Sequence, residues 1–94
     1  MNAYKYVNEM GLKQSKEHTL VLAYIENYED LNSLQQAISD FEMFEDAKSK
    51  MFGSSVSDSE VRNWFLTANK GLLKEKGLLL VDAIKRIEIG LDGE

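Results

Sequence analysis

Residues 33–52 read SLQQAISDFEMFEDAKSKMF and carry the clearest helical pattern in the chain. Asn32 or Ser33 can accept hydrogen bonds from the first free backbone N–H groups of such a helix. Gly53 follows its last turn, where glycine commonly ends a helix. The spacing predicts an amphipathic helix over 33–52 whose apolar side consists of Leu34, Ala37, Ile38, Phe41, Phe44 and Met51.

This helix belongs to a stretch with an uneven charge distribution. Residues 17–47 contain eight carboxylates and no Lys or Arg, so their formal charge is −8, against +3 for the rest of the chain. On the predicted 33–52 helix, carboxylates project from the polar side, and Met43 points away from the apolar stripe among them. A surface of one sign favours a partner surface of the opposite sign. We therefore expect a protein-binding site with a basic partner at Glu42, Met43, Glu45 and Asp46.

The residues before this helix predict shorter elements. Residues 3–10 form a first helix that ends at Gly11, and residues 12–18 can continue it after a bend. The run 19–25 fits either a helix or a buried strand, and we prefer the helix because no partner strand is evident nearby. Residues 27–32 predict a turn. If the run is helical, Val21, Tyr24 and Ile25 form an apolar stripe that Tyr28 continues.

Residues 57–76 predict a second long helix. Ser57 and Glu60 form a capping box, and Gly77 follows the last predicted turn. Trp64 and Phe65 are expected in the core. The full apolar stripe comprises Val61, Trp64, Phe65, Ala68 and Leu72.

Two leucines of the 57–76 helix lie outside that stripe. Leu66 and Leu73 are seven residues apart on a different side, which predicts a second packing surface for the last helix or for another copy in a homodimer. The last helix is expected over 79–89, and a strand over 78–81 is the alternative. Its apolar face comprises Leu80, Ala83, Ile84, Ile87 and Leu91.

The fold class that these elements predict is all-α. A chain without proline, rich in Ala, Leu, Lys, Glu and Gln, favours helices. We expect one helical domain over residues 1–94, a small irregular bundle of four to five helices around an antiparallel helix pair. The short connection 53–56 assigns that pair to 33–52 and 57–76.

Composition narrows the function classes. The chain has no Cys, which excludes disulfides and thiolate metal sites. Its net charge of −5 argues against broad binding to nucleic-acid backbones or anionic membranes. No signal peptide pattern opens the sequence, and the longest apolar run covers only residues 78–81. These features predict a cytoplasmic protein.

Catalytic or metal chemistry has little support in the sequence. His18 is the single histidine and lies in a polar segment, which excludes a multi-histidine metal site. Glu42, Glu45 and Asp46 have i, i+3, i+4 spacing that can hold a cation or pair two acids, but a solvated helix face is the commoner arrangement. We find no calcium-loop spacing and no glycine-rich phosphate loop. The prediction is a non-enzymatic protein without a cofactor or metal.

The alternative function is a DNA-binding regulator that uses the 57–76 helix. That helix carries several cations and follows a short connection, as in a helix-turn-helix motif. The candidate nucleic-acid contacts are Arg62 and Lys70. The long acidic helix before it argues against this interpretation.

Two segments carry a resemblance to known proteins: residues 2–12 read NAYKYVNEMGL and residues 30–37 read DLNSLQQA. In these segments the chain resembles the small accessory proteins encoded in the early regions of temperate enterobacterial phages. The resemblance implies a protein that binds and inhibits or modulates a host protein, such as a nuclease or a defence complex that handles DNA. It assigns no functional residue to this sequence.

Overall fold

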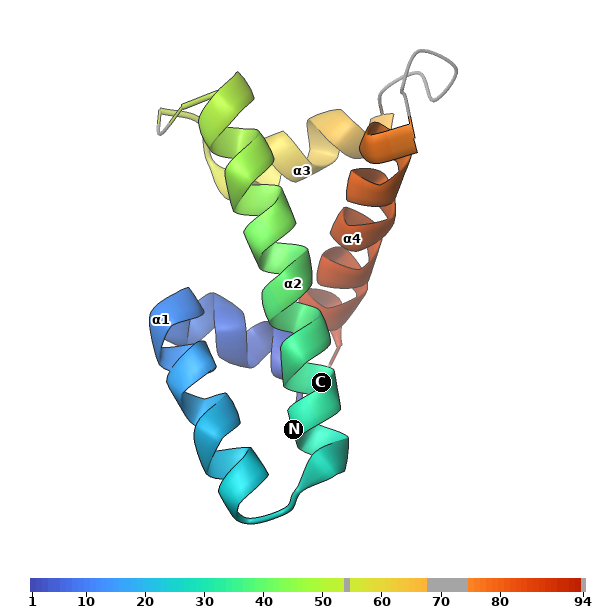
Figure 1. The fold of residues 1–94 in the computed structure, drawn as a ribbon. Helices are drawn as coiled ribbons and strands as arrows, with labels where there is room; N and C mark the ends of the chain where they lie inside the picture. The colour runs from blue at the N-terminus through green and yellow to red at the C-terminus, as the bar shows by residue number, and fades with distance from the viewer. Residues whose placement is uncertain (54, 68–74, 94) are drawn as a thin grey trace.

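Four helices are present in residues 1–53, 55–67 and 75–93, the part of the chain that the computed structural model describes, with backbone alone for residues 75 and 76. They are α1 (Ala3–Tyr24), α2 (Tyr28–Met51), α3 (Asp58–Thr67) and α4 (Glu75–Asp92). No strand occurs in these residues, and both segments with a strand alternative are helical (Figure 1). The all-α prediction is confirmed.

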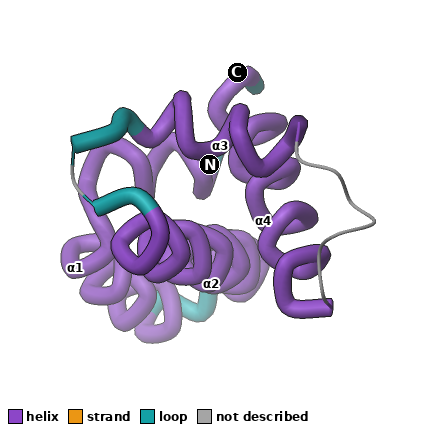
Figure 2. Tube along the Cα trace, turned by 90° about the horizontal axis from the view of Figure 1, so that it is seen from above, coloured by secondary structure: helices purple, strands orange, loops and turns teal. Residues whose placement is uncertain are grey.

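α2 is the central helix of an elongated molecule that measures 44 × 26 × 24 Å. Seen from above, it lies between α1 and α4 (Figure 2). The second half of α1 runs antiparallel to the start of α2, and α3 crosses near the other end of α2 (Figure 1). The most extensive packing joins α1 to α2, while α3 packs on α4. An antiparallel pair is therefore present, but α1 takes the place predicted for the 57–76 segment.

Gly11 bends α1 where the sequence predicts an interruption. Its backbone has φ 84° and ψ 167°, a combination that is essentially restricted to glycine. Beyond the bend, the Ser15 hydroxyl donates to the Gly11 carbonyl oxygen at 2.6 Å. The rings of Tyr6 and His18 stack across the bend with centroids 5.0 Å apart. The predicted short helices therefore join into one bent helix.

The apolar stripe predicted within residues 19–25 faces solvent, contrary to expectation. Leu22 is buried in the hydrophobic core instead, whereas Val21 and Tyr24 are exposed. Apolar residues occupy both sides of this segment, so their spacing does not reveal which side packs. The predicted turn over 27–32 is also wrong, because α2 already begins at Tyr28 with Asn27 as its N-cap.

The boundary between the last two helices differs from the prediction as well. α3 ends at Thr67, and α4 begins at Glu75, so Gly77 lies inside a helix and does not end one. One of the two bonds of the predicted capping box is present at the start of α3, since the Ser57 hydroxyl accepts from the Glu60 N–H at 3.3 Å. The predicted positions Ala68, Lys70, Leu72 and Leu73 lie outside the described residues.

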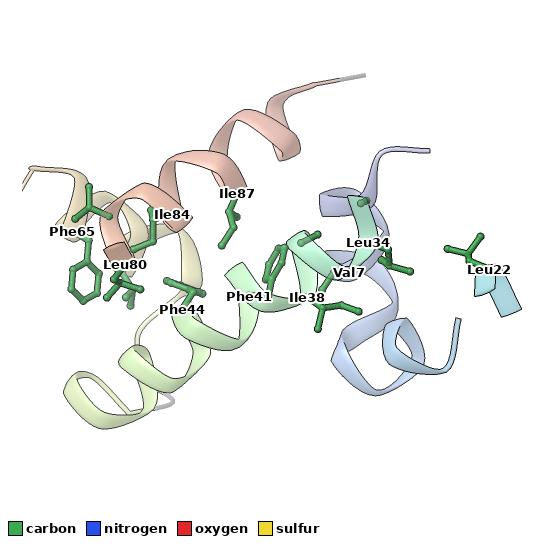
Figure 3. Packing of buried hydrophobic residues seen from close by; sticks show 14 residues of the cluster. Val7, Leu22, Leu34, Ile38, Phe41, Phe44, Phe65, Leu80, Ile84 and Ile87 are labelled. Atoms are coloured by element: carbon green, nitrogen blue, oxygen red, sulfur yellow. The ribbon is translucent and has the colours of Figure 1, made fainter. Parts of the chain in front are cut away.

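The core forms a continuous row along α2. Figure 3 shows it extending from Phe65 and Leu80 through Phe44 and Phe41 to Leu34. The predicted stripes of α2 and of the last helix supply most of it. The predicted core positions of Met51 and Trp64 are wrong. Met51 is 57% exposed, and Trp64 is 47% exposed although its neighbour Phe65 is buried. The fully buried side chains include Leu34, Phe44, Val61, Ile84 and Ile87.

Candidate functional site

An apolar groove lies between the second half of α2 and the start of α4. Its volume is about 380 Å³. The side chains that line it on α2 include two of the four predicted site residues, Met43 and Asp46. Met43, Met51 and Leu79 are 38%, 57% and 53% exposed, so the groove is open to solvent. Its full lining comprises Met43, Asp46, Ala47, Lys50, Met51 and Leu79.

Two carboxylates of the predicted acidic face already have cationic partners. Glu42 Oε2 lies 3.1 Å from Lys16 Nζ of α1, and Asp46 Oδ2 lies 3.0 Å from Lys50 Nζ one turn further along α2. All four side chains are exposed, so each pair contributes only about 0–1 kcal/mol to stability. Such weak pairs can open when another cation approaches. The acidic face is therefore less negative than its carboxylates alone suggest, but its ion pairs can be replaced by pairs with a bound partner.

Glu45 points to a different side of α2. With Val7, Leu12 and Asp58 it lines a crevice of about 370 Å³ beside the bend of α1. Burial and the neighbouring Asp58 carboxylate raise the pKa of Glu45. Asp58 itself is paired with Lys48 at 2.5 Å, and this pair ties the end of α2 to the start of α3. The four predicted site residues are therefore divided between two surfaces.

A buried carboxylate that sequence reasoning missed joins three helices. Asp40 is 1% exposed and accepts two hydrogen bonds from Arg86 of α4, both 2.8 Å long. Tyr4 of α1 donates to the same carboxylate at 2.7 Å, and Gln36 donates at 3.0 Å. The sequence does contain a sign of its burial, because Asp40 falls within the buried face of the 33–52 helix. This cluster fixes α1 and α4 against α2.

Alkaline pH should weaken this cluster through Tyr4. Burial, with the Asp40 carboxylate beside it, raises the Tyr4 pKa from 10.0 to about 12. Because the folded state holds this proton more tightly, the stabilisation is fully present below pH 10 and is lost as pH rises through about 12. Urea unfolding from pH 9 to 12 should show the stability advantage of the wild type over Tyr4→Phe shrinking above pH 10. A constant difference over that range would contradict the assignment.

The residues of the alternative nucleic-acid site are not arranged for phosphate contact in the described part of the chain. The Arg62 side chain is only 10% exposed and forms an ion pair with Glu88 of α4. Its guanidinium carbon also lies 5.7 Å from the centre of the Phe44 ring. Of the predicted second packing surface, Leu66 is half-buried against the core. Lys70 and Leu73 lie outside the described residues.

Within the described residues, no group of three or more His, Asp or Glu side chains is placed to hold a metal ion. No helix there is long and apolar enough to cross a membrane. No family model matches the chain, and neither the curated proteins nor the solved structures include a match.

Proposed function

We propose that this chain is a non-enzymatic protein-binding module that receives apolar side chains of a basic partner in the α2–α4 groove. The observation that carries the proposal is the groove itself, where Met43, Met51 and Leu79 surround an open volume of about 380 Å³. That volume falls within the usual range of ligand sites. Its occupant would be an amphipathic helix with Lys or Arg beside its apolar face.

The apolar lining supplies the affinity in this proposal. Methionine side chains are unbranched and polarizable, so they adapt to the shape of a partner. Burying a Met or Leu side chain completely contributes about 1.5–3 kcal/mol, and the three exposed side chains here can each be covered further. The cost of association offsets part of this gain, which makes a moderate affinity the expected outcome.

The charges beside the groove supply partner selection. Asp46 lines the groove and Glu42 lies one turn away on the same polar side of α2. Their present partners Lys50 and Lys16 are exposed and can be displaced by cations of the bound protein. A basic partner would therefore exchange one ion pair for another, and the net charge of −5 on the chain favours it over an acidic partner. This predicts association that slows as salt is added.

The resemblance to phage accessory proteins extends the proposal to the partner's class. A host protein that handles DNA, such as a nuclease or a defence complex, presents basic surface because it binds phosphate. The proposed module would meet such a protein in the cytoplasm and inhibit or modulate it. This step rests on the resemblance together with the charge of the chain.

Capture from an enterobacterial lysate tests the groove. We expect immobilised wild-type protein to retain at least one host protein that a Met43→Glu variant does not retain, because the new carboxylate places charge in the apolar lining. Ile89→Glu is the matched control, since Ile89 is 73% exposed on α4 and does not line the groove. Quantitative mass spectrometry compares the captured proteins, and circular dichroism confirms that each variant is folded.

The outcomes separate clearly. Loss of the same protein from Met43→Glu alone supports the groove. Equal capture by wild type, Met43→Glu and Ile89→Glu contradicts it. A charge-reversed variant, Glu42→Lys with Asp46→Lys, tests the second part of the proposal. If its capture matches the wild type at physiological salt, the acidic face does not select the partner.

A further inference from the structure

At the end of α2 opposite the groove, α1 turns into α2 (Figure 1). Exposed apolar side chains on this turn form a second surface. We name it the hairpin surface and define it by Leu20, Val21, Tyr24, Ile25 and Tyr28. Tyr24 is 89% exposed and Leu20 is 72% exposed, while the other three are 52–59% exposed. Clusters of exposed large apolar side chains on one short segment usually mark an interaction site.

The backbone of this turn is fixed by hydrogen bonds on both sides. The N–H of Asn27 donates to the Leu22 carbonyl at 3.0 Å, and the N–H of Glu26 donates to the Ala23 carbonyl at 3.2 Å. This is the pattern of a Schellman C-cap, in which Glu26 takes the left-handed position with φ 59°. Asn27 then caps α2 by accepting from the Asp30 N–H. The hairpin surface is thus pre-organised, which lowers the entropic cost of binding.

Within residues 17–30, which carry the hairpin surface, the charged side chains are carboxylates apart from His18. Glu17, Glu26 and Glu29 are exposed beside it, and the surrounding residues 17–47 contain no Lys or Arg. Among the ion pairs of the described residues none involves these three carboxylates, whereas Asp30 lies 3.9 Å from the N-terminal amine. A second copy of this chain would bring like charges together across a two-fold axis. A cationic partner would not meet that repulsion.

We infer that the hairpin surface is a docking site for a second protein partner, one whose apolar side chains are flanked by Lys or Arg. It is separate from the groove, because Tyr28 and Met43 are 15 residues apart on α2, or roughly 22 Å at the helical rise. Both surfaces can therefore be occupied together. The chain would then act as an adaptor that holds two basic proteins at its two ends.

A pair of model peptides tests the inference. The probe is an 18-residue amphipathic helix of Leu and Lys, and its counterpart replaces every Lys by Glu. NMR chemical-shift mapping of the full chain should show the Lys peptide moving the amide signals of residues 20–28. The double variant Leu20→Ser, Tyr24→Ser should weaken binding at those signals about tenfold, as expected for exposed aromatic and aliphatic anchors. Ile89→Ser, which alters an equally exposed side chain on α4, should leave it unchanged.

Three results would overturn the inference. The first is equal binding of the Glu peptide, which removes the charge argument. The second is shifts confined to residues 43–51 and 79, which leaves the groove as the site and excludes the hairpin surface. The third is a homodimer in light scattering that the double variant abolishes, which makes a second copy the occupant. The groove proposal stands or fails separately, through Met43→Glu.

Discussion

Replacing Arg86, whose side chain is 45% exposed, by methionine is expected to lower the free energy of unfolding by about 1.5–3 kcal/mol. The reason is that Asp40 is 1% exposed and would keep a buried carboxylate without its cation. Arg86 donates two of the four hydrogen bonds that this carboxylate accepts, while Tyr4 and Gln36 donate the others. Neutral donors alone do not offset the cost of removing a full charge from water. Urea denaturation at pH 7 measures the loss.

Two further variants separate this effect from general damage to α4. Lys85→Met alters the neighbouring exposed residue and should change stability by less than about 0.5 kcal/mol. The double variant Asp40→Asn with Arg86→Met should be more stable than Arg86→Met alone, because the amide carries no buried charge. If Arg86→Met costs under about 1 kcal/mol, or if the double variant is less stable than the single one, Asp40 does not hold the helices together as described.

Gly90→Ala should destabilise the protein by about 2 kcal/mol, opposite to the usual effect of this change in a helix. A Cβ atom at this position would lie 2.5 Å from Cβ and Cγ of Tyr4. The start of α1 would have to move away from α4, which also disturbs the bond from the Tyr4 hydroxyl to Asp40 and the 2.7 Å bond from Asn2 to the Gly90 carbonyl. Thermal or urea unfolding of the variant measures the change.

Gly93→Ala provides the matched control for this prediction. A Cβ there meets its nearest atom at 3.4 Å, an ordinary contact, so the stability should stay close to that of the wild type. If Gly90→Ala is as stable as the wild type or more stable, the close approach of α1 and α4 at Tyr4 is incorrect. The pair of variants therefore tests the packing of the two chain termini.

The predictable part of the fold came from helices with one apolar side. In α2 the spacing of Leu34, Ile38, Phe41 and Phe44 has a single interpretation, and all four are buried. The bend at Gly11 was equally predictable, since it needs a backbone conformation that glycine favours. In segments with apolar residues on two sides, the buried side was not predictable from the sequence. Residues 20–25 present such residues all round, and only tertiary packing decides that Leu22 faces inward.

The candidate site was predictable only in part, for a related reason. Met43 was identified because it stands alone among polar residues, and the structure places it in a groove with Met51 and Leu79. The groove itself depends on how α4 lies against α2, which periodicity within one helix cannot reveal. The sequence does not single out Asp40 among the eight carboxylates of residues 17–47, because its partners, Tyr4 and Arg86, lie 36 and 46 positions away in sequence.

Photo-crosslinking from the groove tests the central claim, that this surface binds a host protein, most directly. Met43 is replaced by a photoreactive methionine analogue, the protein is expressed in enterobacterial cells, and covalent adducts formed on illumination are identified by mass spectrometry. Our proposal predicts an adduct with a basic host protein from position 43 and none from the same analogue at the exposed position 89. Equal crosslinking from both positions, or none from position 43, would contradict it.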